Sequence, residues 1–334
     1  MLDAAESGAL DAPEGRAQLV EQALEDPRAT ATMVRFFSMW LGLQKLNKAI
    51  KVDKIYPEWR AVKAHFDDEF TQHVGALVAR NAPLSELFLS SKTMANHTLR
   101  EFYGATHPDG VTPGDDETFL EVDLGERRKG ISRGAFLSIT GKTERSAPVL
   151  RGVFVREHML CSPLGSPPPG ADAQRPSRDA KMLTDREFWS DSTEGANCVG
   201  CHDQINPVGF TFEHFDAIGG WRDMDRGSPV DASGAITGLG APVPVSGYGE
   251  LIDTLGQAPE VTDCMMRFWF RSRVRHFETS QERAIIRSWA DALNAQHGEV
   301  RLKDMSRAIA TSAFFNQASF FARLRGSPRV FASA

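Results

Sequence analysis

The sequence has no long apolar run and no excess of positive charge. No stretch approaches the roughly 20 apolar residues that span a bilayer, and the mean hydropathy is -0.31. The formal net charge of -6 argues against the clustered lysines and arginines that bind nucleic acids or anionic membranes. We therefore expect no transmembrane segment and no nucleic-acid partner.

A secretory signal is also missing from the start of the sequence. Residues 1–20, "MLDAAESGALDAPEGRAQLV", contain neither a basic n-region nor an apolar h-region. We therefore recognise no signal peptide in these residues.

Cysteine is scarce, with four residues among 334. Cys198 and Cys201 fall in one Cys-x-x-Cys-His run, which ends at His202. Cys161 and Cys264 are left over as an even number, compatible with one disulfide in an oxidising compartment and with buried thiols in the cytosol. The pair is a candidate disulfide.

Helical periodicity dominates what is present. Apolar residues recur at three- or four-residue spacing over 33–46 and 59–77. Thr184 with Glu187, and Thr279 with Glu282, match the capping box that begins a helix. Further helices are expected over 261–273 and near Met305, and Ser146 is expected to cap a helix with Pro148 in its first turn.

Strand signals are few, so the predicted fold is mainly α, with little β and long irregular loops. One short strand is expected at 120–124, and 226–247 is expected to be irregular because it is rich in Gly and Pro. A turn-rich break at 107–117 and a Pro-rich linker at 162–178 suggest boundaries. The predicted domains are helical 1–116, motif-bearing 117–223 and helical 224–334.

The five residues from Cys198 to His202 are typical of covalent haem attachment. Two thiols one helical turn apart can each form a thioether to the porphyrin, and the next residue offers an imidazole to the iron. Val199 and Gly200 are small enough to leave room for a porphyrin edge. We interpret the Pro207 carbonyl as a candidate acceptor for His202 Nδ1. Nearby aromatic residues are candidates to cover a haem face, namely Phe210, Phe212, Phe215 and Trp221.

Three other readings of the motif remain open from the residues alone. Zinc prefers four ligands, and Cys161 and Cys264 would have to complete the site. A thioredoxin-like redox pair requires a preceding strand and a βαβ setting, whereas the segment before Cys198 is expected to be helical. In the last reading the cysteines are structural and hold no cofactor.

The segment "CVGCHDQINPVGFTFEHFDAIGGWR" resembles a family of secreted, cytochrome-c-like proteins of planctomycetes and myxobacteria that are built from consecutive domains of unknown function. Their run is Cys-x-x-Cys-His, then Pro-x-Gly-Phe, then Glu-x-Phe-Asp-x-x-Gly-x-Trp-Arg. In this sequence the later positions are Pro207, Gly209, Phe210, Glu213, Phe215, Asp216, Gly219, Trp221 and Arg222.

The resemblance extends over nearly the whole chain, and it implies one covalent haem c held by Cys198, Cys201 and His202. It also implies electron transfer with an unknown redox partner protein, in the periplasm or outside a Gram-negative-type bacterium. Family members begin with a secretion signal and further domains, so the resemblance implies that this chain is N-terminally truncated. The sequence departs from the family at 146–148, with one extra residue, and at "FRSRVRHF", 270–277.

The residue on the distal side of the iron is open at this stage. A methionine there raises the reduction potential and a second histidine lowers it, whereas an open position permits oxidoreductase chemistry. The downstream candidates are Met224, Met265, Met266, Met305, His214 and His276.

Overall fold

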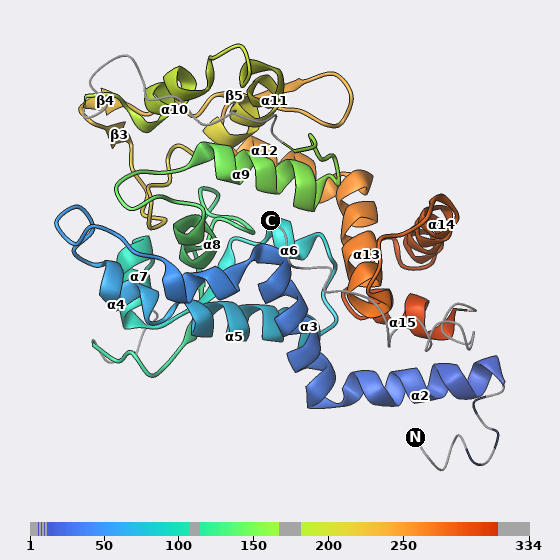
Figure 1. The fold of residues 1–334 in the computed structure, drawn as a ribbon. Helices are drawn as coiled ribbons and strands as arrows, with labels where there is room; N and C mark the ends of the chain where they lie inside the picture. The colour runs from blue at the N-terminus through green and yellow to red at the C-terminus, as the bar shows by residue number, and fades with distance from the viewer. Residues whose placement is uncertain are drawn as a thin grey trace. The chain divides into compact units, whose positions relative to one another are not determined.

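The computed structural model describes residues 12–106, 114–166 and 182–312, together with Glu6, Gly8 and Leu10. Helices make up most of it, and its strands form two-stranded antiparallel sheets (Figure 1). The predicted mainly α fold with little β is confirmed. No described helix is long and apolar enough to cross a membrane.

The chain divides into two compact units, and each is assembled from more than one segment. The first contains Met1–Trp40, Val74–Ser85 and Thr262–Ala334, and the second contains Leu41–His73 and Glu86–Val261. The units therefore do not follow consecutive thirds of the sequence. The Cys-x-x-Cys-His run lies wholly within the second unit.

The first unit is a set of helices closed by aromatic packing and one ion pair. The Phe36 ring meets the Trp269 ring edge to face at 4.6 Å between centroids, and Arg307 Nη2 donates to Glu21 Oε2 at 2.7 Å. The Thr279–Glu282 capping box is present as predicted. Its helices are α2 (Pro13–Glu25), most of α3 (Pro27–Leu41) and α13 (Pro259–Val274), α14 (Ser280–His297) and α15 (Asp304–Thr311).

The second unit begins with short helices and one small sheet. The predicted strand appears as β2, whose Val122 is in register with Thr93 of β1. The helix predicted over 59–77 is divided in two, because the chain turns at Ala64 and His65 and three acidic residues then favour a new helix N-terminus. These elements are η1 (Leu43–Lys48), α4 (Trp59–Lys63), the first part of α5 (Phe66–Ala79), α6 (Glu86–Leu89), β1 (Lys92–Ala95), α7 (His97–Tyr103), β2 (Leu120–Asp123) and α8 (Gly134–Ile139).

The rest of the second unit surrounds the Cys-x-x-Cys-His run. The expectation that 226–247 is irregular is wrong in part. Two segments there pair as the antiparallel strands β5 and β6, with Gly234 opposite Val245. The predicted linker at 162–178 falls mostly outside the described residues. The elements are α9 (Pro148–Phe154), the π-helix η2 (Val155–Met159), α10 (Asp185–Thr193), α11 (Val199–Phe210), β3 (Met224–Asp225), β4 (Ser228–Pro229), β5 (Gly234–Ile236), β6 (Val243–Val245) and α12 (Tyr248–Gln257).

Helices α9 and α11 pack at unusually short range, and glycine makes this possible (Figure 1). A Cβ at Gly209 would lie 2.1 Å from the Pro148 carbonyl oxygen, and one at Gly152 would lie 2.3 Å from the Ile205 carbonyl oxygen. Contacts below 3 Å to backbone cannot be relieved by a side-chain rotation. Two glycines, one on each helix, therefore fix the position of α11.

The segment after α11 is locked by a buried arginine. Arg151 on α9 is fully buried, and its Nη1 donates to the carbonyls of Phe212 and Phe215 at 3.1 and 2.8 Å. Its Nη2 donates to the Asp216 carbonyl at 2.8 Å. Asp216 Oδ1 in turn accepts from the backbone N–H groups of Ile218 and Gly220. The Glu-x-Phe-Asp-x-x-Gly stretch is thus a structural turn clamped onto α9.

The predicted capping role of Ser146 is wrong. The N-cap of α9 is Ala147, which makes no side-chain cap. Ser146 instead donates its hydroxyl to Glu213 Oε1 at 3.1 Å, because the chain brings a buried carboxyl against it. Pro148 does occupy the first turn of α9.

Replacing Gly209 with alanine tests the close crossing of α9 and α11. We expect G209A to lower the free energy of unfolding by about 1–3 kcal/mol, the usual cost of overpacking. Gly200 lies on the same helix and a Cβ there would meet nothing within 4 Å, so it is the matched control. G200A should be neutral or slightly stabilising in urea unfolding, since alanine favours helix. Equal midpoints for the two variants would contradict the close contact.

Candidate functional site

The Cys-x-x-Cys-His run forms the first turn of α11. Helix α10 begins at Asp185 with the predicted Thr184–Glu187 capping box, and a short turn then leads to Cys198, the N-cap of α11. Residues i, i+3, i+4 and i+7 share one face of a helix. That face carries Cys198, Cys201, His202 and Ile205, and all four line a single open groove.

The groove is closed on its other sides by three segments. The α9–η2 segment supplies Val153, Arg156 and Glu157, the loop beyond η2 supplies Leu164 and Gly165, and the turn before α11 supplies Asn197. Its wall is thus apolar apart from the motif, one amide, one arginine and one glutamate. Burial raises the pKa of Glu157 above its ordinary value.

The four cysteines differ in their bonding. Cys198 and Cys201 are free thiols, the first buried and the second half-buried. Cys161 and Cys264 are each disulfide-bonded. The two thiols of the motif are therefore available for other chemistry, whereas Cys161 and Cys264 cannot serve as thiolate ligands in this state.

The His202 ring is oriented by a chain of polar side chains. Its Nδ1 lies 3.0 Å from Asn206 Oδ1, and Asn206 Nδ2 donates to Thr193 Oγ1 at 2.9 Å. Because an amide oxygen can only accept, this contact assigns the ring proton to Nδ1 and leaves Nε2 as an acceptor. A histidine that binds a metal through one nitrogen commonly donates from the other in this way.

The acceptor predicted for His202, the Pro207 carbonyl, is wrong. That oxygen faces β5, where a Cβ at Gly234 would lie only 2.0 Å from it. Asn206 was missed, although its spacing was a usable signal, since residue i+4 lies one turn further along the same helical face.

The aromatic residues expected to cover a haem face lie elsewhere. Phe212 and Phe215 are fully buried, and both rings pack against Tyr248 at the start of α12. Trp221 stacks on His214 at 4.5 Å, and Phe210 lies under the guanidinium of Arg186. None of the four expected rings is among the described residues that line the groove. Core burial of large aromatic rings takes precedence here.

The downstream candidates for a distal ligand do not converge on the groove among its described lining residues. In the second unit, His214 Nδ1 bonds the Arg222 carbonyl at 2.8 Å and Met224 is exposed. In the first unit, His276 Nδ1 bonds the Phe277 carbonyl, and the three methionines are buried in the core: Met265, Met266 and Met305. The described residues therefore identify no distal ligand.

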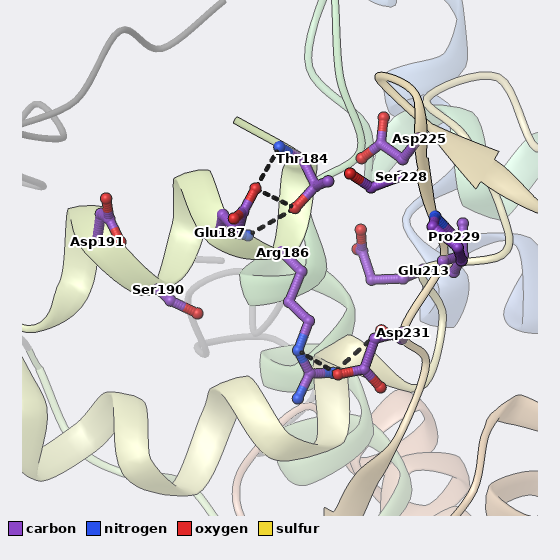
Figure 2. Close-up of a pocket in the computed structure, with 11 residues that line it drawn as sticks. Thr184, Arg186, Glu187, Ser190, Asp191, Glu213, Asp225, Ser228, Pro229 and Asp231 are labelled. Atoms are coloured by element: carbon purple, nitrogen blue, oxygen red, sulfur yellow. Dashed lines mark hydrogen bonds and ion pairs between the residues drawn. The ribbon is translucent and has the colours of Figure 1, made fainter. Parts of the chain in front are cut away.

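A second polar site lies beside α10 (Figure 2). Asp185, Glu213 and Asp225 bring carboxylate oxygens within 4.8 Å of one another, and they are the one such group found among the described residues. Arg222 already occupies this group: its Nη2 lies 3.2 Å from Asp185 and 3.1 Å from Glu213, and its Nη1 lies 2.9 Å from Asp225. The guanidinium supplies the positive charge that a cation would bring, so the cluster is a buried ion-pair network.

The rest of that pocket is lined by side chains that bond one another. In Figure 2, Glu187 reaches back to Thr184 in the capping box, and Arg186 reaches Asp231, with Nε 3.3 Å from Oδ2. The capping box is local to the start of α10, whereas Arg186 ties α10 to the loop between β4 and β5. Both side chains are thus engaged within the protein.

Comparison with known families gives two matches. The model PSCyt3, described as a protein of unknown function (DUF1588), matches residues 128–225, which include the Cys-x-x-Cys-His groove. The model PSD4, described as a protein of unknown function (DUF1592), matches residues 1–105. The chain is therefore similar to consecutive domains of unknown function, as the resemblance implied. No curated protein and no solved structure matches it.

The buried carboxyl of Glu213 gives the second unit a pH-dependent stability. Burial, with Asp185 adding to it, raises the pKa of Glu213 to about 7 in spite of Arg222. A raised carboxyl pKa stabilises the fold below the unfolded value, and this contribution is lost as the pH rises through about 7. We expect the melting temperature of E213Q, minus that of the parent, to increase between pH 5 and pH 8.

The matched control for this measurement is E121Q, since the Glu121 side chain is 59% exposed. E121Q should leave the pH profile parallel to that of the parent. A parallel profile for E213Q as well would show that Glu213 is ionised throughout.

Proposed function

We propose that the chain is a c-type cytochrome-like protein that binds one covalent haem and transfers electrons outside the cytoplasm. The observation that carries the proposal is the shared face of α11, where two free thiols and a histidine with an available Nε2 line one groove. The resemblance of residues 198–222 to secreted cytochrome-c-like proteins supports the same function. The alternative is a non-haem structural or interaction module with a disulfide or zinc at this segment.

The residues of the groove fit a haem better than they fit zinc. A structural zinc site needs about four ligands packed around one point. Cys198, Cys201 and His202 do not form such a group in the described part of the chain, where the one cluster within 4.8 Å is carboxylate. Cys161 and Cys264 are disulfide-bonded and so cannot complete it. A porphyrin, by contrast, is held at separate points along its edge and at its iron.

Each residue of the groove has a separate task in this proposal. Cys198 and Cys201 would hold the haem as thioethers, and His202 would ligate its iron through Nε2. Asn206 Oδ1 accepts a hydrogen bond from Nδ1–H, which fixes the ring and increases the basicity of Nε2. When bound, haem supplies an iron that alternates between ferric and ferrous states. The apolar residues Val153, Leu164 and Ile205 exclude water from part of the groove.

The disulfide state of Cys161 and Cys264 supports the proposed location. Disulfides persist in oxidising compartments and are rare in the cytosol. Covalent haem attachment likewise takes place outside the cytoplasm in the bacteria that the resemblance indicates. We therefore propose a periplasmic or secreted protein with an unknown redox partner protein.

Covalent loading tests the proposal directly. We expect the full chain, exported in a host with cytochrome maturation machinery, to gain the mass of one haem and a Soret band that survives acid-acetone extraction. The double variant C198S/C201S should lose both signals. The pair C161S/C264S is the matched control, because it removes two cysteines outside the motif and should retain the haem. A colourless parent that copurifies with zinc would favour the alternative.

The Asn206 contact predicts a change in reduction potential. We expect N206A to load haem but to raise the midpoint potential, because a less basic histidine stabilises ferric iron less well. Redox titration checks this against N197A, which changes an asparagine of the same groove outside the hydrogen-bond chain. An unchanged potential in N206A would remove Asn206 from the site.

A further inference from the structure

Arg156 is a buried cation in the wall of the groove. It is 3% exposed, and it lies in the π-turn that continues α9. Its Nη1 donates to Thr237 Oγ1 at 2.7 Å, and its Nη2 donates to Ser162 Oγ at 3.0 Å. Both partners are neutral hydroxyls, so the side chain is held in place without its charge being neutralised.

Part of the guanidinium has no partner. Nε is buried and makes no hydrogen bond. A guanidinium has five N–H donors, and the two bonds to Thr237 and Ser162 use two of them. No carboxylate among the described residues forms an ion pair with Arg156, and burial alone lowers the pKa of this arginine. Glu157, which lines the same groove, shows no charge interaction with it.

Such an arrangement is costly unless an anion completes it. Burial of an unpaired charge is strongly unfavourable, and a buried arginine is usually paired with a carboxylate or phosphate. Arginine also binds carboxylates through two parallel N–H groups, which gives strong and directional contacts. Two other buried arginines of the same unit are compensated more fully: Arg222 is surrounded by three carboxylates, and Arg151 donates to four backbone carbonyls.

We propose that Arg156 is the anion-binding residue of this groove and that it binds a carboxylate of the ligand held there, a propionate if that ligand is haem. The inference rests on the proposed function for the identity of the ligand. The rest of the wall is apolar around it, with Val153, Leu164 and Ile205, so the groove suits a flat apolar ring that carries an acid at its edge. Single π-turns within α-helices are frequent at functional sites.

The test uses a ligand that needs neither the thioethers nor the iron. Metal-free protoporphyrin IX and its dimethyl ester share the ring and differ in the two carboxylates. We expect the colourless full chain, made without maturation machinery, to bind the free acid at least tenfold more tightly than the ester, measured by porphyrin fluorescence. In R156Q the preference should vanish, and in R156K it should be reduced. Equal affinity of the parent for acid and ester overturns the proposal without any variant.

A matched control and a second readout separate this inference from the haem proposal. R60Q removes an exposed arginine of the same unit, which pairs with Asp53, and should retain the preference for the acid. T237A is the second variant, for use if R156Q fails to fold. It keeps Arg156 but removes the hydroxyl that accepts from its Nη1, so it should weaken the preference for the free acid. In haem-loaded material we expect R156Q to lower the midpoint potential, since a positive charge near the iron favours the ferrous state.

The outcomes are distinguishable. If the chain gains the mass of one haem but binds the free acid and the ester equally, the haem function stands and Arg156 has no part in it. Preference for the acid in a chain that never gains haem supports an anion site and contradicts the covalent cytochrome. Binding of neither porphyrin contradicts the role of Arg156 as well.

Discussion

The close crossing of α9 and α11 is the constraint on which the second unit depends. Gly152 and Gly209 let two helix backbones approach to distances that any side chain would prevent. Because the two helices are that close, Arg151 reaches the carbonyls that follow α11 and donates hydrogen bonds to them. The position of α11, and so of the thiols and the histidine at its start, is therefore set by backbone contact rather than by the groove itself.

This arrangement separates two kinds of residue within one sequence signature. The Cys-x-x-Cys-His part faces a groove and carries the candidate chemistry. The later part, from Glu213 to Arg222, builds a clamped turn and a buried ion-pair network with Asp185 and Asp225. This carboxylate cluster is thus explained by a structural arginine. Arg156, a polar residue of the groove wall, lies outside this signature, and Asn206, which bonds His202, lies between these two parts of it.

Local sequence predicted those helices and strands whose position depends on interactions between residues close in sequence. The two capping boxes at Thr184 and Thr279 form as expected, because they depend on residues three positions apart. The strand near Val122 and the helix that bears Met305 also follow from short-range periodicity. Predictions failed where a distant partner competes: Ser146 bonds Glu213 instead of capping α9, and the Pro207 carbonyl faces Gly234 instead of His202.

The sequence by itself determined that this is a mainly helical chain with a Cys-x-x-Cys-His turn, since helical spacing places Cys198, Cys201 and His202 on one face whatever surrounds them. Only the tertiary structure decided what lies opposite that face. It brings Arg156 to the groove from 42 positions before Cys198, and it places Phe212 and Phe215 in the core instead. Long-range packing makes these choices, because buried area and the pairing of buried charge depend on partners that no local pattern specifies.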